Sequence, residues 1–145
     1  MHKLHNSKLL PFIIATIWTV ILSIILLQPE NQPMIPTGVQ PAPPSLKREI
    51  IFSSLHLLTF GLTALLWCFS VKPDKQSKIL LAMLMILLIT FGLVVEYLQS
   101  SIPGRTAQWW DMLANSIGII GGIVLWLKLS SLNAKQFFQV FGWNS

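Results

Sequence analysis

The sequence predicts an all-α polytopic membrane protein, a four-helix transmembrane bundle that forms a single domain over residues 1–145. The chain is 53% hydrophobic and only 10% charged, and its mean hydropathy is +0.66, which is too apolar for an ordinary soluble domain. Four mostly apolar stretches are each long enough to cross a hydrocarbon core of about 30 Å as a helix. This composition excludes most soluble enzyme folds.

The first predicted span covers residues 9–27 and follows the basic residues Lys3 and Lys8. Pro11 is expected in the first turn, where a helix has spare amide donors in any case. A cleaved signal peptide is the alternative, but its apolar region would be shorter. The sequence after the span, Gln28-Pro29-Glu30, also lacks a small-residue cleavage site. We therefore interpret the span as a retained anchor.

The segment after the first span is rich in proline. Six of the nine prolines lie between Gln28 and Pro44, which forbids a helix and predicts an extended outer loop over residues 28–47. The later apolar stretches predict spans at residues 49–71, 79–98 and 107–129. The aromatic tail over residues 130–145 is too short to span and is expected to lie in the membrane interface.

The distribution of basic residues predicts that both termini are cytoplasmic. Seven of the ten Lys and Arg residues then lie inside: Lys3, Lys8, Lys72, Lys75, Lys78, Lys128 and Lys135. Only Lys47, Arg48 and Arg105 face outward, as the positive-inside rule requires. Because the basic residues flank the apolar stretches, a nucleic-acid partner is not expected, whereas membrane lipid is.

Most tryptophans fall near the expected ends of spans, where amphipathic rings prefer the headgroup level. Trp67 and Trp126 lie near inner ends. Trp109 and Trp110 lie near an outer end. Trp18 lies in the middle of a span and does not fit this pattern.

The cysteine count argues against redox and metal chemistry. Cys68 is the only cysteine, so the chain cannot form an internal disulfide. The sequence also has neither a CxxC motif nor a Cys/His cluster with metal-ligand spacing. No metal site and no cofactor are therefore predicted.

Polar residues gather at one side of the predicted membrane topology. A charge at the centre of a membrane helix costs at least about 2.5 kcal/mol on insertion scales, so each ionisable residue in a span needs an explanation. The polar residues near the outer ends of the last three spans are His56, Glu96, Gln99, Asp111 and Asn115. The short loop between the third and fourth spans holds Pro103, Gly104 and Arg105. We infer one outward-facing polar pocket.

Helical spacing supports this convergence, because residues three and four apart share a face. The faces are Gly92, Glu96 and Gln99 on the third span, His56, Thr59 and Thr63 on the second, and Asp111, Asn115, Gly118 and Gly122 on the fourth. Gly118 and Gly122 form a GxxxG pair that allows close helix packing. Thr106 is a candidate N-cap for the fourth helix, whose N-terminus favours an ionised Asp111 or an anionic ligand.

These residues resemble the motif of the VanZ-like family of small bacterial membrane proteins. The resemblance rests on the run Glu96-x-x-Gln99-x-x-x-Pro103-Gly104-Arg105-x-x-x-x-x-Asp111-x-x-x-Asn115-x-x-Gly118-x-x-x-Gly122, preceded by a histidine early in the second span. It covers residues 49–129 and implies a four-helix layout in the bacterial cytoplasmic membrane. It also implies that the recurring polar positions of the family are His56, Glu96, Gln99, Arg105, Asp111 and Asn115.

The chain departs from the family pattern at two places. Family members often carry Asp-Lys shortly before the histidine and Tyr four residues after it, whereas this chain has Phe52-Ser53 and Phe60. If the Asp-Lys pair binds a ligand in the family, this chain binds it differently. The family name derives from a protein linked to low-level teicoplanin resistance, so the resemblance implies an envelope role and does not identify an activity.

Two interpretations of the charged residues remain open. Glu96, Arg105 and Asp111 can form an ion-pair network that joins two helix ends to their loop. Alternatively, Arg105 binds an anionic head group while His56 or a carboxylate handles a proton. Gln99 and Asn115 are expected to orient the charged groups or contact the ligand.

Three functions follow from these interpretations. The first is recognition of a lipid-linked or cell-wall precursor from the outer leaflet, with Arg105, Gln99 and Asn115 as ligand-binding residues. The second is an enzyme acting on an envelope lipid, with Glu96, Asp111 and His56 as catalytic candidates, although no nucleophile elbow or phosphate loop supports it. The third is a structural or assembly role in a membrane complex. A transporter is disfavoured because the polar groups form no path across the membrane.

Overall fold

The computed structural model describes residues 6–29, 46–71, 77–102, 105 and 108–132, and the regular structure in these ranges is entirely α-helical. The elements in chain order are α1 (Asn6–Leu26), α2 (Leu46–Cys68), α3 (Ser77–Ser100) and α4 (Trp109–Leu132). Each of the four helices contains a stretch long and apolar enough to cross a membrane. The predicted fold class is confirmed. Nearly all of the proline-rich loop and of the aromatic tail lies outside the described residues.

The helix bounds differ from the predicted spans by a few residues. Helix α1 begins at Asn6 and contains Pro11, which therefore lies in the second turn and not in the first. The missing proline amide leaves the Ser7 carbonyl without its helical donor, which water can replace near a helix end. Helix α2 ends at Cys68: the Phe69 amide still bonds to the carbonyl four residues back, but the amides of Ser70 and Val71 bond to carbonyls three residues back.

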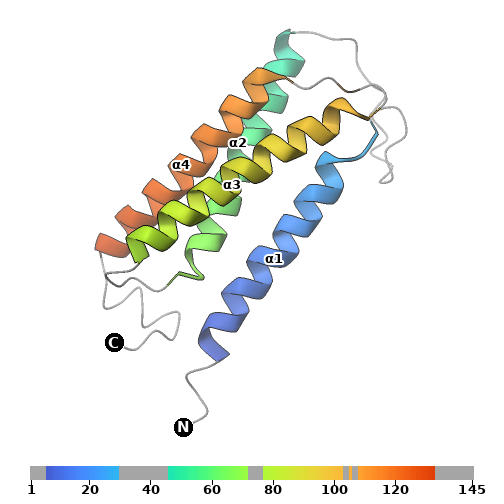
Figure 1. Cartoon of the computed structure of the whole chain (residues 1–145). Coiled ribbons are helices and arrows are strands. Elements are labelled where there is room, and N and C mark those ends of the chain that lie inside the picture. Colours follow the sequence, from blue (N-terminus) through green and yellow to red (C-terminus); the bar gives the residue numbers. More distant parts are fainter. Residues whose placement is uncertain (1–5, 30–45, 72–76, 103–104, 106–107, 133–145) are drawn as a thin grey trace.

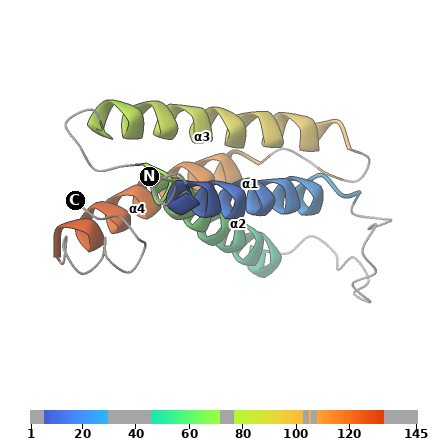
Figure 2. The same ribbon diagram turned by 90° about the horizontal axis from the view of Figure 1, so that it is seen from below.

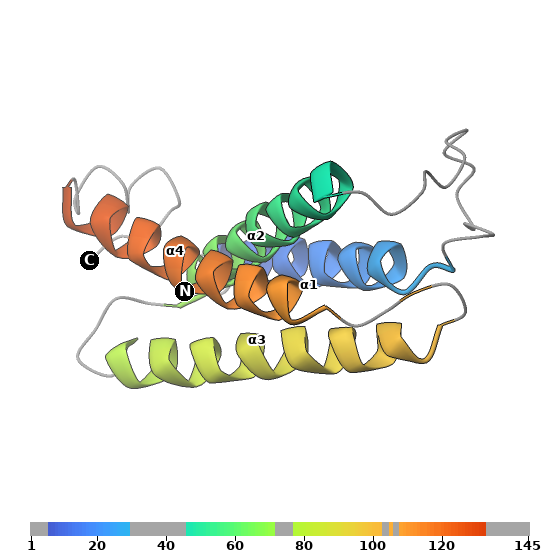
Figure 3. The same cartoon turned by 90° about the horizontal axis from the view of Figure 1, so that it is seen from above.

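The four helices run side by side as a bundle (Figure 1). Helix α3 lies on one side of the bundle and α2 on the other, with α1 and α4 between them (Figures 2 and 3). Helices α1 and α3 finish at the end where α2 and α4 begin, marked by Leu26, Ser100, Leu46 and Trp109. We refer to this end as the polar end.

The most extensive packing joins α2 to α4 through glycine. A Cβ atom on Gly118 would lie 2.2 Å from the Leu57 carbonyl oxygen, and one on Gly122 would lie 2.3 Å from the Gly61 carbonyl oxygen. Both distances are far below van der Waals contact, so the two backbones approach as closely as glycine permits. This helix pair forms the centre of the fold.

Helix α1 is attached to α2 by two tryptophan hydrogen bonds. Trp18 Nε1 donates to Thr63 Oγ1 at 2.9 Å, and Trp67 Nε1 donates to Thr19 Oγ1 at 3.0 Å. The Phe12 ring also meets the Trp67 ring edge to face, with centroids 5.4 Å apart. The mid-span position of Trp18 is explained by this bond, because an indole N–H in hydrocarbon needs a partner.

The remaining tryptophans divide between surface and core. Trp109 and Trp110 are each 56% exposed at the polar end, as expected for a headgroup position. Trp126 is only 1% exposed, so its predicted interfacial position is wrong. Its ring belongs to the hydrophobic core, where a large apolar surface fills the space between helices.

Most hydroxyl groups within the helices are satisfied by their own backbone. The side chains that donate to the carbonyl four residues earlier are Thr16, Thr19, Ser23, Ser54, Thr59, Thr63 and Ser116. This arrangement removes exposed donors from lipid-facing surfaces. The apolar residues on those surfaces include Ile14, Leu58, Leu87 and Ile117, each at least 45% exposed, which suits contact with acyl chains.

Candidate functional site

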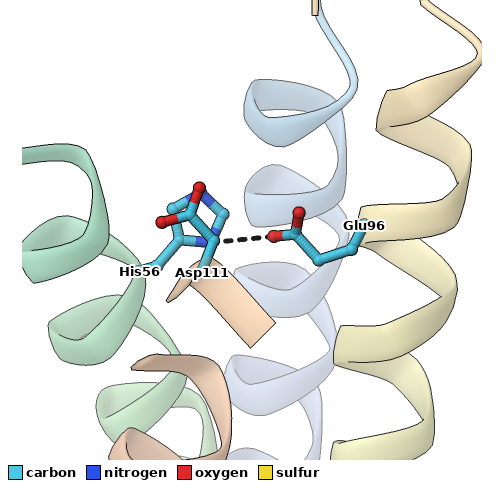
Figure 4. A group of neighbouring side chains, drawn as sticks. All are labelled: His56, Glu96 and Asp111. Carbon is cyan, nitrogen blue, oxygen red and sulfur yellow. Dashed lines mark ion pairs between the residues drawn. The ribbon is translucent and has the colours of Figure 1, made fainter. Parts of the chain in front are cut away.

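Four polar side chains from three helices form a buried group near the polar end. His56 comes from α2, Glu96 from α3, and Asp111 and Asn115 from α4. Figure 4 shows the Glu96 side chain reaching from α3 toward His56 and Asp111. Each of the four is at most 8% exposed, and Glu96 is fully buried. We call these four residues the polar cluster.

Hydrogen bonds within the polar cluster centre on Asn115. Its Oδ1 lies 3.0 Å from His56 Nδ1, and its Nδ2 donates to Glu96 Oε1 over a longer 3.5 Å. His56 Nδ1 also lies 3.5 Å from Glu96 Oε1, an ion pair when the imidazole is protonated. The amide therefore bridges an imidazole and a carboxylate from two other helices, as expected for an orienting residue.

Asp111 is held by a hydroxyl group from α2. Ser53 Oγ donates to Asp111 Oδ1 at 2.5 Å. Asp111 also lies in the first turn of α4, where the positive end of the helix dipole favours a carboxylate. Ser53 stands at one of the positions where the chain departs from the family motif, so this departure alters a residue in direct contact with the cluster.

One oxygen of Glu96 has no full hydrogen bond. Within the described residues, Oε2 is buried and meets no donor in full hydrogen-bond geometry, although the Gln108 backbone amide interacts with this carboxylate and Oε1 faces His56 and Asn115. The negative charge of Asp111 repels a charged Glu96 carboxylate, whereas the positive charge of Arg105 attracts it. A buried carboxylate oxygen without a full hydrogen bond is costly, and the other buried polar atoms without a partner in the described residues are Ser70 Oγ and Trp126 Nε1.

Gln99 and Arg105 lie beside the cluster and bind the end of α1. Gln99 Nε2 and Arg105 Nη1 both donate to the Leu26 carbonyl oxygen at 2.8 Å. The last carbonyls of a helix lack intrahelical partners, and these two side chains supply donors to one of them. Of the three ligand-binding candidates, Gln99 and Asn115 are buried and Arg105 is partly exposed.

Aromatic rings close the cluster on the side facing the bundle centre. Phe60 is fully buried, and its ring lies nearly parallel to the His56 ring, with centroids 6.3 Å apart. Its other neighbour is the Phe91 ring at 5.9 Å. Gly92 lies against Phe60 and Asn115, which lets α3 approach α4.

The cluster lies just inside the polar end. At a rise of 1.5 Å per residue, Asp111 is about 3 Å from the start of α4 and Glu96 about 6 Å from the end of α3. His56 is deeper, about 10 Å from the start of the α2 span at Glu49. The group therefore lies within about 10 Å of the ends of these helices or spans.

The structure brings together most of the residues predicted from the sequence. His56, Glu96, Asp111 and Asn115 meet directly, and Gln99 and Arg105 adjoin them through Leu26. Thr59 and Thr63 do not join the cluster: Thr59 bonds to its own helix, and Thr63 accepts the Trp18 bond. Pro103, Gly104 and Thr106 lie outside the described residues. Sequence reasoning missed Ser53 and the Leu26 carbonyl.

The fold and the cluster define a multi-pass membrane protein with a buried carboxylate and imidazole group near one membrane surface. The family model described as VanZ/LLP1 matches residues 3–132, and the chain belongs to this family. Comparison with curated proteins and with solved structures gives no match.

Proposed function

We propose that this VanZ/LLP1 family member is an envelope protein of the bacterial cytoplasmic membrane that recognises the polar head group of a lipid or lipid-linked precursor at the polar cluster. The observation that carries this proposal is the meeting of the buried Glu96 carboxylate with two further buried ionisable side chains, His56 and Asp111. Ionisable side chains at membrane depth are expensive and commonly mark a functional site. The three ionisable residues of the cluster come from three helices, and Glu96 lies four residues before the end of α3 at Ser100.

Arg105 has a supporting role in this proposal. Its bond to the Leu26 carbonyl keeps the guanidinium at the polar end, where it interacts with the Glu96 carboxylate. A guanidinium has five N–H donors and suits phosphate oxygens. We assign it to the anionic part of the head group. If the bound lipid is a cell-wall precursor, a change in teicoplanin susceptibility is an expected consequence.

Lipid capture by site variants tests this function. Wild-type protein in nanodiscs containing a polyprenyl diphosphate should retain that lipid in native mass spectrometry. Glu96→Gln, Asp111→Asn and Arg105→Ala should each reduce the retained fraction at least ~10-fold, about 1.4 kcal/mol of binding free energy. Glu49→Gln is the matched control, because Glu49 is an exposed acid at the same end of α2.

The two other functions predict different outcomes in the same experiment. Unfolding or loss of all three site variants from the membrane would support a structural or assembly role instead. The enzyme alternative is favoured by one observation, the imidazole of His56 placed against Glu96 and Asn115, since a positioned imidazole is the most common general acid or base. Turnover of the lipid that disappears in Glu96→Gln would establish the enzyme.

The proposal also requires that the polar end faces outward, with both termini cytoplasmic. Lys47 and Lys128 are exposed and belong to opposite ends of the bundle, so they form a matched pair for labelling. In a Cys68→Ala background, a membrane-impermeant maleimide should label Lys47→Cys in intact cells. It should label Lys128→Cys only after permeabilisation. The reverse pattern would contradict the orientation and the outer-leaflet ligand.

A further inference from the structure

The polar cluster contains a set of side chains with metal-ligand chemistry. His56, Glu96 and Asp111 each offer one ligand atom, and these three atoms all lie within 4.8 Å of one another. The three residues come from α2, α3 and α4, and all are buried. Their wide separation in sequence is the reason that no short metal motif is visible in the chain.

The distances suit a divalent cation. Ligand bonds of about 2.0–2.2 Å place two ligand atoms of one tetrahedral ion roughly 3.4 Å apart. His56 Nδ1 and Glu96 Oε1 are 3.5 Å apart, which is already this spacing. The 4.8 Å limit for the whole set exceeds it, so Asp111 would close in by a small side-chain rotation. Its partner Ser53 is a hydroxyl that can follow.

Charge and hydrogen bonding point to the same conclusion. Two carboxylates repel one another in a low-dielectric site, and a cation between them removes that repulsion. In the described ranges Glu96 Oε2 is buried and has no donor in full hydrogen-bond geometry, although the Gln108 backbone amide interacts with this carboxylate, so Oε2 has capacity for a cation. When His56 Nδ1 binds a metal instead of Asn115, the Asn115 side-chain oxygen becomes a further oxygen donor.

We propose that His56, Glu96 and Asp111 bind one divalent transition-metal cation, Zn²⁺ or Mn²⁺. The site offers one imidazole nitrogen, a ligand that suits Zn²⁺, and two carboxylate oxygens, which suit Mn²⁺. The cation site goes beyond the proposed function, because it rests on the cluster geometry and not on any lipid. It also supplies what an acid-rich site lacks for a phosphate ligand, since a bound cation can link carboxylates to phosphate oxygens.

Direct metal titration tests the site. The full chain, purified without a histidine tag and treated with a chelator, is titrated in detergent with ZnCl₂ or MnCl₂ alone. Bound metal is counted by inductively coupled plasma mass spectrometry after equilibrium dialysis. We expect one ion per chain at micromolar metal. Because outer-shell changes alone lower metal affinity roughly 10-fold to 100-fold, Glu96→Gln and Asp111→Asn should each lower it at least ~10-fold.

Control variants separate the site from adventitious binding. Glu49→Gln changes an exposed acid, and the His2→Ala/His5→Ala double variant removes the other histidines of the chain. Both should bind metal like the wild type. As a check on folding, each site variant must keep the wild-type helical circular dichroism. If a variant does not, His56→Gln removes a different ligand of the same site and replaces it in the test.

Two results would overturn the cation site: wild-type chain that binds neither metal at micromolar concentration, or unchanged affinity in folded Glu96→Gln and Asp111→Asn. Failure of the lipid function gives a different pattern. One metal ion would then bind as expected, but polyprenyl diphosphate retention would be the same in the wild type and the site variants. Lipid retention that survives the chelator would show that the cation does not link the lipid phosphate to the carboxylates.

Discussion

Gly118→Ala should separate α2 from α4 and destabilise the bundle by about 2–3 kcal/mol, because the added Cβ would lie 2.2 Å from the Leu57 carbonyl oxygen. The obstacle is backbone on both sides, so no side chain can rotate away. The Gly61 amide nitrogen is a second obstacle at 3.1 Å. The loss is measured as the shift in the unfolding midpoint when dodecyl sulfate is titrated into mixed micelles.

Gly121→Ala is the matched control for this effect. A Cβ on Gly121 meets no described atom within 4 Å, although this glycine lies on the same helix and next to Gly122. Alanine also has the higher helix propensity, so the control should be neutral or slightly stabilising. Equal destabilisation by both substitutions would show that the α2 and α4 backbones are not in close contact.

Asn115→Leu should cost about 2–4 kcal/mol of stability, because it leaves two buried polar groups without their bridging partner. The His56 ring nitrogen and the Glu96 carboxylate both lose a hydrogen bond to the same amide. Leucine has the same number and branching of side-chain heavy atoms and is not smaller, so the loss does not reflect a cavity. The same unfolding titration measures it.

Ser116→Ala controls for the loss of a polar group at the neighbouring position of α4. Among the described residues, the Ser116 hydroxyl bonds to the Met112 carbonyl of its own helix, so its removal should change stability by less than about 0.5 kcal/mol. Wild-type stability in Asn115→Leu would mean that water already solvates His56 and Glu96. In that case the cluster would be an open aqueous site and not a closed hydrogen-bonded group.

The sequence was sufficient to predict the four helices and the gathering of polar residues. A long apolar stretch is a direct signal of a membrane helix, and the cost of a buried charge makes Glu96 and Asp111 conspicuous. The positions of His56 and Asn115 near the outer ends of their spans then predict that they lie on the same side of the membrane as these acids. Burial against one another follows because isolated polar groups do not persist in hydrocarbon.

The partners of these residues could not be predicted in the same way. The Leu26 carbonyl is a backbone acceptor, and no side-chain pattern identifies it as the target of Gln99 and Arg105. Ser53 is one of many serines that could bond to its own helix, yet it reaches Asp111. Trp126 had the position of an interfacial ring but packs in the core, because rotation about the helix axis is set by packing.

The shared use of the Leu26 carbonyl sets an order for assembly in the membrane. Chains are synthesised from the N-terminus, so α1 enters the bilayer before the segment carrying Gln99 and Arg105 has been translated. Its terminal carbonyl gains these donors only when α3 and the following turn arrive. Helix α1 can therefore bond to α2 through Trp18 and Trp67 early, whereas its polar end is attached late, and a chain truncated before Gln99 would lack this second attachment.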